Sequence, residues 1–404
     1  MQTQINEFAC GNFILKSTKI LYDEVLKKVF GSAKHELYTK LFSILSEVAC
    51  EKDYLENLTS HSDAIHWHLN RVDIVEFEEI LMNFFMSFLK HLRKSVSWHK
   101  ISIAFDETYV PFYGKPIDNW VVRYNNRVKG ATGSYKFMAC SIIVAKKRYI
   151  IGIMPMYNCQ NSTQVVDQML DVIRSKFRVE TVLCDRGFCS KKLCRELEKK
   201  NLKYLVLAPK WKNISRYLQE GRLEVIEKTT ISEKKTQTNF DWRFLFAYDE
   251  SGYDWAFATN LQETPANLVK LYKCRWGIET NFRVMDFADI KSKSKNIVTR
   301  CFFFLISAFL FNSWLEFDKD MTFESYLDNL AYSQTSLQDL LEKWKKSKQL
   351  FGAPISDAEQ KILSSFALMR RSCPSFPVGY TPKLACRQSA NFVISLQGIS
   401  ACTV

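Results

Sequence analysis

The sequence is poor in residues that interrupt regular structure, with 13 glycines and 9 prolines among 404 residues. So few of them exclude a collagen-like chain, a linker-rich chain and an all-β fold of many short strands. The sequence also lacks a GxxxxGK[ST] loop, which excludes the usual phosphate-binding loop of nucleotide hydrolases. Apolar side chains are abundant, at 47% of the chain, so large cores are expected and general disorder is excluded.

Metal-binding cysteine patterns are missing as well. The 12 cysteines form no CxxC pair, and no cysteine pair stands at zinc spacing from a histidine pair. We therefore predict mostly reduced, buried cysteines in a cytoplasmic protein. The first residues, MQTQINEFACGNF, lack the charged and apolar regions of a secretory signal, which agrees with this expectation.

The run Cys301–Leu315 is uncharged but short for a membrane span, which needs about 20 apolar residues. It contains Asn312 and is followed at once by Glu316. We predict a buried core helix here and no membrane partner.

Acidic residues are fewer than basic ones: the chain has 43 Asp and Glu and 56 Lys and Arg, which gives a net charge of +13. The excess is concentrated in residues 190–240, with 13 basic against 6 acidic residues, and in 267–300, with 8 against 3. The commonest partner of such a chain is a polyanion such as DNA.

The length predicts two to four folding units of roughly 100–200 residues each. Residues 1–98 show apolar side chains at helical spacing, so we predict a helical N-terminal region there. Within it, Ser62–Leu92 predicts two helices broken near Asn70 to Asp73. Such a pair fits either a DNA-binding helix-turn-helix or an ordinary helical bundle.

The pattern changes near Trp98, and residues 99–208 predict the first part of an α/β core. The order is three strands, a helix, a strand, a helix and a strand. The expected helices are Ser162–Phe177, with Ser162 as its N-cap, and Lys191–Lys200. The expected strands are His99–Asp106, Tyr135–Val144, Arg148–Met154, Arg178–Asp185 and Lys203–Leu207.

Residues 209–264 interrupt this order and predict a β insertion. Its expected strands are Leu223–Thr230, Trp242–Tyr248 and Trp255–Thr259, with a charged loop at Ser232–Thr238. A helix then begins after Thr264, with Pro265 in its first position, and extends to about Asp289. Residues 265–317 form the second part of the core, and 318–404 a helical, basic C-terminal region and tail.

Two acids, Asp106 and Asp185, each end an apolar strand. In an open α/β sheet, binding sites form at such strand ends. Either residue alone could instead be a helix cap or a turn residue.

A third acid lies on the helix that begins at Pro265. At about 100° per residue, the residues Tyr272, Arg275, Glu279, Arg283 and Asp286 fall on one polar stripe. A solvated charged face is one interpretation of the stripe. A functional face is the other, and the tyrosine favours it.

Converging carboxylates repel one another, so a cation explains them better than packing does. Mg²⁺ prefers carboxylate oxygens. Two Mg²⁺ ions about 3.5–4 Å apart can activate the nucleophile and stabilise the leaving oxygen when a phosphodiester is cut. The carboxylates here that would hold Mg²⁺, with Mn²⁺ as a substitute, are Asp106, Asp185 and Glu279.

Three motifs together resemble the DDE transposases of prokaryotic insertion sequences: FDET at Asp106, LCDRGF at Asp185, and YKCRWGIE ending at Glu279. The resemblance covers roughly residues 99–317 and is strongest to the insertion-sequence-four-like group with its archaeal relatives. That group carries Tyr-x2-Arg-x3-Glu-x6-Lys on the helix of the catalytic glutamate, which Tyr272, Arg275 and Glu279 match. The resemblance implies a ribonuclease-H-like catalytic domain with a β insertion, and a catalytic triad of Asp106, Asp185 and Glu279.

The sequence departs from that motif at one position, because the lysine of the family falls on Asp286. Arg283 and Lys291 are the candidate substitutes, so we assign DNA binding to Tyr272, Arg275, Arg283 and Lys291. A tryptophan of the insertion either stacks on a DNA base or packs in a small core, and the candidates are Trp211, Trp242 and Trp255.

The resemblance implies a transposase that cuts double-stranded DNA at the ends of its element and joins the 3′ ends to target DNA. It also implies a homodimer in the synaptic complex and a nucleoid-associated protein. Two alternatives stay open. One is a ribonuclease-H-like nuclease such as a junction resolvase, and the other is a catalytically impaired, transposase-derived DNA-binding protein.

Overall fold

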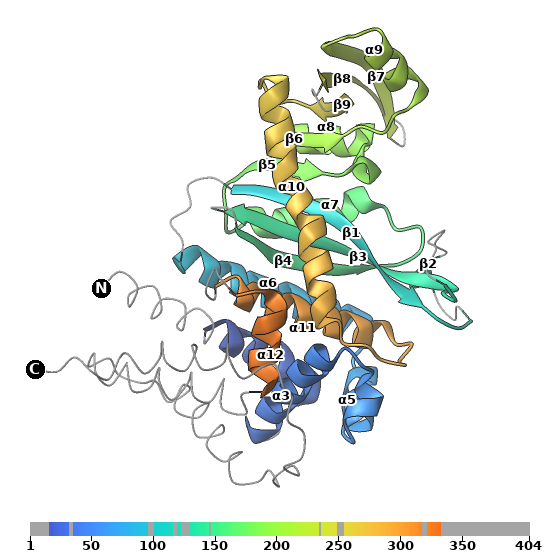
Figure 1. Cartoon of the computed structure of the whole chain (residues 1–404). Coiled ribbons are helices and arrows are strands. Elements are labelled where there is room, and N and C mark those ends of the chain that lie inside the picture. Colours follow the sequence, from blue (N-terminus) through green and yellow to red (C-terminus); the bar gives the residue numbers. More distant parts are fainter. Residues whose placement is uncertain are drawn as a thin grey trace, which may run out of the picture.

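The structure is a computed structural model of the whole chain (Figure 1). It describes residues 16–31, 35–95, 101–115, 119–122, 129–144, 147–233, 236–248, 254–316 and 321–332. Most of the predicted C-terminal region therefore lies outside the described residues. Of that region, the structure describes the helix α12 (Phe323–Tyr332).

One mixed sheet of nine strands forms the centre of the molecule, in the order β2-β3-β1-β5-β6-β9-β8-β7, with β4 also beside β3. The strands β1, β5 and β6 are parallel, and the other neighbours are antiparallel. This arrangement confirms the predicted α/β class. The strands are β1 (Ile101–Phe112), β2 (Val121–Val122), β3 (Gly133–Val144), β4 (Lys147–Met156), β5 (Val179–Cys184), β6 (Lys203–Leu207), β7 (Glu224–Glu233), β8 (Thr236–Tyr248) and β9 (Asp254–Thr259).

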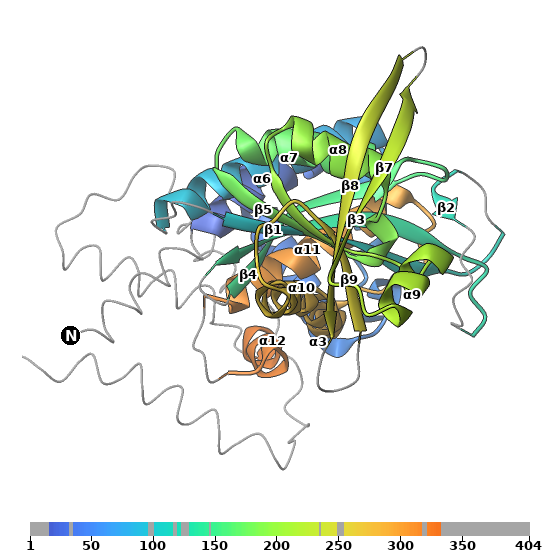
Figure 2. The same cartoon turned by 90° about the horizontal axis from the view of Figure 1, so that it is seen from above.

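Helices cover both faces of this sheet. α7 (Ser162–Arg174) and α8 (Lys191–Lys199) lie on one face, and α10 (Pro265–Met285) crosses the other (Figures 1 and 2). The remaining helices are α2 (Lys27–Phe30), α3 (His35–Glu51), α4 (Leu55–Leu58), α5 (Ser62–Asn70), α6 (Ile74–Ser95), α9 (Lys212–Gln219) and α11 (Ile297–Trp314), with a π-helical turn at Tyr22–Leu26 and 3-10 turns at Arg186–Phe188 and Asp286–Ala288.

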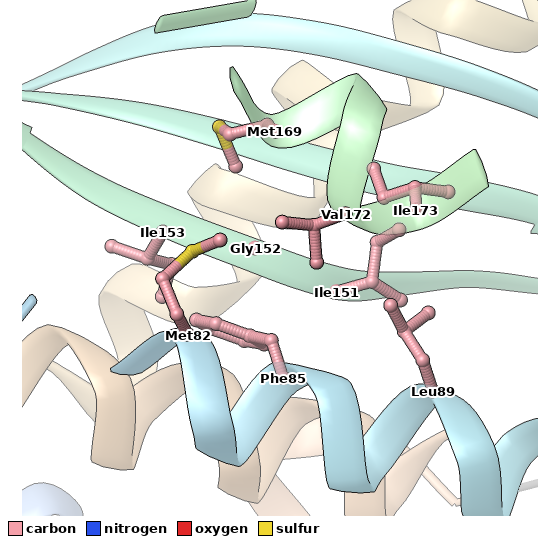
Figure 3. A pocket seen from close by; sticks show the side chains of 9 residues that line it. All are labelled: Met82, Phe85, Leu89, Ile151, Gly152, Ile153, Met169, Val172 and Ile173. Carbon is pink, nitrogen blue, oxygen red and sulfur yellow. The ribbon is translucent and has the colours of Figure 1, made fainter. Parts of the chain in front are cut away.

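The predicted break in the N-terminal region is confirmed, because α5 ends at Asn70 and α6 begins at Ile74. α6 packs on β4 and α7, where Phe85, Ile151 and Met169 help to line a small apolar pocket (Figure 3). Every side chain around this pocket is apolar, so it is a packing feature of the core. α6 therefore packs on the sheet by one apolar face, and DNA binding by the N-terminal region stays a prediction.

The apolar run Cys301–Leu315 lies in α11 and is a buried core helix, as predicted. α11 is long and apolar enough to cross a membrane by composition, but it is enclosed by β4 and by the helices around it. Its Asn312 side chain accepts a hydrogen bond from the Ile150 amide at 2.9 Å and donates one to the Ile150 carbonyl at 2.7 Å. Both bonds satisfy backbone groups of β4 that would otherwise be buried without partners.

Three local predictions need correction. Ser162 is not the N-cap of α7, because the Asn161 side chain accepts from the Thr163 amide at 2.9 Å. The charged segment Ser232–Thr238 is mostly strand, since β7 and β8 pair out to Glu233 and Thr236, and the hairpin projects from the body (Figure 2). The helix α9 was missed. The strands of the insertion extend the central sheet, because β9 pairs with β6.

The N-terminal helices dock on the segment between α10 and α11 through one partly buried carboxylate. Glu56 accepts hydrogen bonds from the Ser292 hydroxyl at 2.7 Å, from the Lys293 amide at 2.9 Å and from His66 Nε2 at 2.9 Å. Burial alone would raise the pKa of Glu56, but the hydrogen bonds outweigh it and lower the pKa. The contact therefore stabilises the fold above the usual glutamate pKa and is lost as the pH falls through the lowered value.

We expect Glu56→Gln to reduce the free energy of unfolding at pH 7 by about 1.5–3 kcal/mol, the range for hydrogen bonds to a charged group. The deficit should shrink below about pH 4, where the unfolded chain takes up a proton at this glutamate, and disappear once the pH falls through the lowered pKa of the folded protein. Urea unfolding at pH 7 and at a pH well below 4 measures both effects. Glu79→Gln, which removes an exposed carboxylate of α6, is the matched control, and an equal effect of the two variants would contradict the assignment.

Candidate active site

The register of the central sheet places Asp106 beside Asp185. The parallel pairing of β1 with β5 ends at Phe105 opposite Cys184, and an aspartate follows directly on each strand. The two residues are 79 positions apart in the chain. Parallel strands carry their next side chains out at the same edge, so the register alone brings these two carboxylates together.

The predicted strand end at Asp106 is wrong in one respect, because β1 continues to Phe112 and Asp106 lies near its middle. It is the neighbouring strand β5 that ends, so Asp106 is at the point where β1 loses its partner on that side. β3 stays paired with β1 beyond this point, with Asp106 opposite Ala139. The Glu107 amide donates to the Asp106 carboxylate at 2.9 Å.

The two acids of the FDET motif face opposite sides of the sheet. Asp106 faces α10, as its ion pair with Arg275 shows. Glu107 lies 2.8 Å from Lys136 Nζ and accepts from the Ser162 hydroxyl at 2.5 Å, on the side of α7. Glu107 is thus neutralised within the fold, and Asp106 is the acid available on the α10 side.

A buried arginine lies between the two aspartates. Arg275 Nη1 is 3.6 Å from Asp106 Oδ2, and Nη2 is 3.7 Å from Asp185 Oδ1. The arginine side chain is 2% exposed, against 13% for Asp106 and 30% for Asp185. Because its charge is shared by two carboxylates, Arg275 supplies the counter-charge that lets them lie close together.

Tyr272 orients Asp185 from the preceding turn of α10. Its hydroxyl donates to Asp185 Oδ1 at 2.9 Å, and its ring lies 4.9 Å below the Arg275 guanidinium. Burial raises the pKa of Tyr272, and the Asp185 charge adds to this effect while Arg275 opposes it. The hydroxyl therefore stays protonated and remains a hydrogen-bond donor. Trp255 and Phe257 pack against the ring.

The other predicted site residues lie further along α10 or beyond it. Glu279 is on α10, one turn after Arg275, and its side chain lies outside the described residues. Arg283 is exposed near the end of the helix. Lys291 follows the helix and donates to the Lys52 carbonyl at 2.8 Å.

Asp286, at the position of the family lysine, caps the C-terminus of α10. Desolvation and the neighbouring Asp289 raise the pKa of Asp286 to about 6. The carboxylate is therefore mostly ionised at pH 7 and negative where the resembling group is positive. It also lies at the helix end where the backbone dipole disfavours an anion.

Two of the three insertion tryptophans are core residues. Trp242 and Trp255 are 3% and 6% exposed, whereas Trp211 is 38% exposed at the start of α9. Trp211 is therefore the one whose ring can reach a ligand without rearrangement of a core.

The carboxylates suit a hard divalent cation. Mg²⁺ is usually held by one or two carboxylates together with water and substrate phosphates, and Asp106 and Asp185 supply such a pair. Within the described residues there is no cluster of three histidine, cysteine, aspartate or glutamate side chains placed to hold a metal. Glu279, the third predicted ligand, is not among the side chains described.

Sequence reasoning placed Arg275 on the polar stripe but missed its partners. The expectation from the sequence was a contact between Arg275 and DNA. The 3-residue spacing from Tyr272 was the available signal, since it puts both side chains on the face that crosses the strand ends.

We expect Arg275→Met to lower the free energy of unfolding by more than ~2 kcal/mol, because two partly buried carboxylates lose their counter-charge. Urea unfolding at pH 7 measures this loss. Arg283→Met removes an exposed arginine from the same helix and should change stability by less than about 0.5 kcal/mol.

Our sequence-based expectation was that loss of Arg275 would weaken DNA binding and lower its salt slope by about one unit. A salt series on Arg275→Met tests that expectation in the same samples. A lower slope with unchanged stability would assign Arg275 to DNA rather than to the aspartates.

Comparison with known proteins adds two findings. Residues 98–310 match the family model described as the transposase DDE domain. The chain is also similar to a chain in the cryo-EM structure of the piggyBac transposase synaptic complex with hairpin DNA, with a TM-score of 0.51 and 14% identity over 89% of this chain and 80% of that one. This likeness supports the ribonuclease-H-like fold. No curated protein is significantly similar in sequence.

Proposed function

This chain belongs to the transposase DDE domain family, and we propose that it cuts DNA at the ends of its own element and joins the 3′ ends to target DNA. The observation that carries the proposal is the pair Asp106 and Asp185, brought to one point by the β1–β5 register beneath α10. α10 also carries Glu279, the third member of the proposed triad. Tyr272, Arg275 and Glu279 keep the spacing of the insertion-sequence-four-like group, to which we assign the chain.

Divalent metal ions are the general cofactor of this family, and we propose Mg²⁺, with Mn²⁺ as a substitute. Asp106, Asp185 and Glu279 would hold two such ions, which supply an activated nucleophile and a stabilised leaving oxygen. Arg275 supplies the positive charge that lets the two aspartates lie close together. Tyr272 fixes the orientation of Asp185, and the Glu107 amide that of Asp106.

The proposed reaction has two steps, cleavage at the element end and joining to the target. In the first, a water oxygen bonds to the scissile phosphorus and the P–O3′ bond breaks, which leaves a 3′-hydroxyl and a 5′-phosphate. In the second, that 3′-hydroxyl attacks a phosphodiester of the target, and the target's own 3′-oxygen leaves. Both steps use the same carboxylate site.

The partners that we propose are double-stranded DNA of the element ends and of the target. The net charge of +13 and the basic stretches on both sides of the site in sequence support a polyanion. A homodimer would hold the two ends of one element, and the protein would be associated with the nucleoid. Trp211 is the insertion residue that we propose for stacking on a base near the cut.

We expect Asp106→Asn, Asp185→Asn and Glu279→Gln each to abolish strand cleavage and to spare binding to element-end DNA. Each change removes a metal-binding charge at nearly constant shape. Cleavage of an end duplex in Mg²⁺ and its affinity in a gel-shift assay are the two measurements. Asp171→Asn, a change at an exposed carboxylate of α7 paired with Lys200, is the control and should cut normally.

Normal cutting by any of the three variants in Mg²⁺ would remove that residue from the catalytic set. No cutting by the unmodified chain, together with intact end binding, would favour the alternative of an impaired, transposase-derived DNA-binding protein. Activity on four-way junctions without preference for element ends would favour a resolvase.

Asp286 gives a separate prediction, because it replaces a lysine of the resembling group. Asp286→Lys should tighten binding to end DNA and steepen its salt slope by about one unit, the effect of one added phosphate contact. It should also stabilise the C-terminus of α10 by about 0.3–1 kcal/mol. Glu79→Lys makes the same change of charge on α6, and equal gains from both variants would show a mere effect of net charge.

A further inference from the structure

Three lysines alternate with two serines in the segment that follows α10. The lysine row, which we define as Lys291, Lys293 and Lys295, is exposed. Ser292 is buried and Ser294 is partly buried between them. The alternation sorts the segment into an outer side of positive charge and an inner side of small polar groups.

The inner side is tied to the core at several points. Arg300 donates to the Ser292 carbonyl at 2.6 Å and to the Ser294 carbonyl at 3.0 Å. The Tyr135 hydroxyl donates to the Lys295 carbonyl at 2.8 Å, and the Ser292 hydroxyl donates to Glu56. These bonds hold the backbone in one orientation with the lysines directed outward. Binding a ligand therefore costs little conformational entropy of the backbone.

The ammonium groups of the lysine row form no ion pair with a carboxylate of the described residues, although the charge of Asp289 acts on Lys291. Lys291 Nζ donates to the Lys52 carbonyl at 2.8 Å and Lys293 Nζ to the Asn57 side-chain oxygen at 3.3 Å, both neutral acceptors. An ammonium group has three donors, so each lysine keeps donors for a phosphate ligand.

The lysine row extends from the N-terminal helices to the tip of the β1–β3 hairpin. Lys295 lies over Gly114, where its Nζ is 3.2 Å from the position that a Cβ would take. Gly114 has a φ of +133°, a conformation that other residues rarely adopt, so this close approach depends on glycine. The segment joins α10 to α11 beside these strand ends (Figure 1).

β1 connects the row to the catalytic aspartates. Asp106 and Phe112 are six residues apart on this strand, a distance of about 20 Å at 3.3 Å per residue. A DNA strand advances about 3.4 Å per nucleotide. The row is therefore roughly six base pairs away from a phosphate bound at Asp106.

We propose that the lysine row binds the phosphodiester backbone of the duplex that leads into the catalytic site, about six base pairs from the cut. The proposal rests on the proposed function for the position of the cut, but the charge of the row and its anchoring do not.

The first test measures phosphate contacts without any cutting. A 30-base-pair duplex of mixed sequence is titrated in EDTA over a salt series with a variant in which Lys291, Lys293 and Lys295 are all glutamine. Loss of three phosphate contacts should lower the log–log salt slope by about three units. The control replaces Lys16, Lys27 and Lys90, three exposed lysines outside both basic stretches, and should keep the original slope.

Equal slopes for the two triple variants would overturn the proposal. If the row variant unfolds, Lys295→Gln alone should lower the slope by about one unit, and an unchanged slope would be equally decisive. A triple change of the row to arginine keeps the charge and should keep the slope.

The second test places the contact relative to the cut. An end duplex with uncharged methylphosphonates about six base pairs from the scissile phosphate is bound to the Asp106→Asn protein. The neutral linkages should weaken binding of this protein several-fold but leave binding of the row variant unchanged. Equal weakening of binding for the Asp106→Asn protein and the row variant would overturn the assigned position. This outcome does not depend on whether the unmodified chain cuts DNA.

Discussion

Two ionised carboxylates can lie side by side, as these do where the pairing of β1 with β5 ends, only if positive charge offsets their repulsion. Asp106 and Asp185 meet this condition through Arg275, which is almost fully buried and reaches both. In water, two unit charges 4 Å apart interact by about 1 kcal/mol, and in a partly buried site by several times more. The aspartates of the sheet therefore need α10 to lie where it does, because this helix carries their counter-charge. Apolar packing holds the helix in the same place.

α10 connects the aspartates to the lysine row at its C-terminal end. Near its middle, Tyr272 and Arg275 bind the aspartates, and Leu268 packs with the apolar side chains of β5 and β6. At its C-terminal end, the chain turns into the segment that Glu56 holds from the N-terminal helices. Any shift of α10 along the sheet would move both the counter-charge of the site and the lysine row. The helix thus fixes the distance between the place of chemistry and the place of DNA contact.

The sequence was sufficient for features that depend on local pattern. The strand before Asp185, the capped start at Thr264 and the buried helix around Asn312 were all predicted, because apolar periodicity and capping residues signal them directly. The length of β1 was not, because its second half (DETYVPF) begins with three polar residues and contains Pro111, which does not continue the apolar strand pattern. That half is strand because β3 pairs with it, and such pairing is a tertiary contact.

The candidate site shows the same division. Residue types and spacing identified the two aspartates and the tyrosine–arginine stripe, since strand ends and helix faces follow from the chain itself. The pairing of Arg275 with both aspartates depends on the angle at which α10 crosses the sheet, which no local pattern encodes. The inward serines between the lysines likewise have a function only once Glu56 and Arg300 are in place. Alternating lysine and serine looks like an ordinary solvated loop in the sequence. In the structure it is a charged edge with a fixed backbone, and a fixed backbone is what separates a specific phosphate contact from general attraction to DNA.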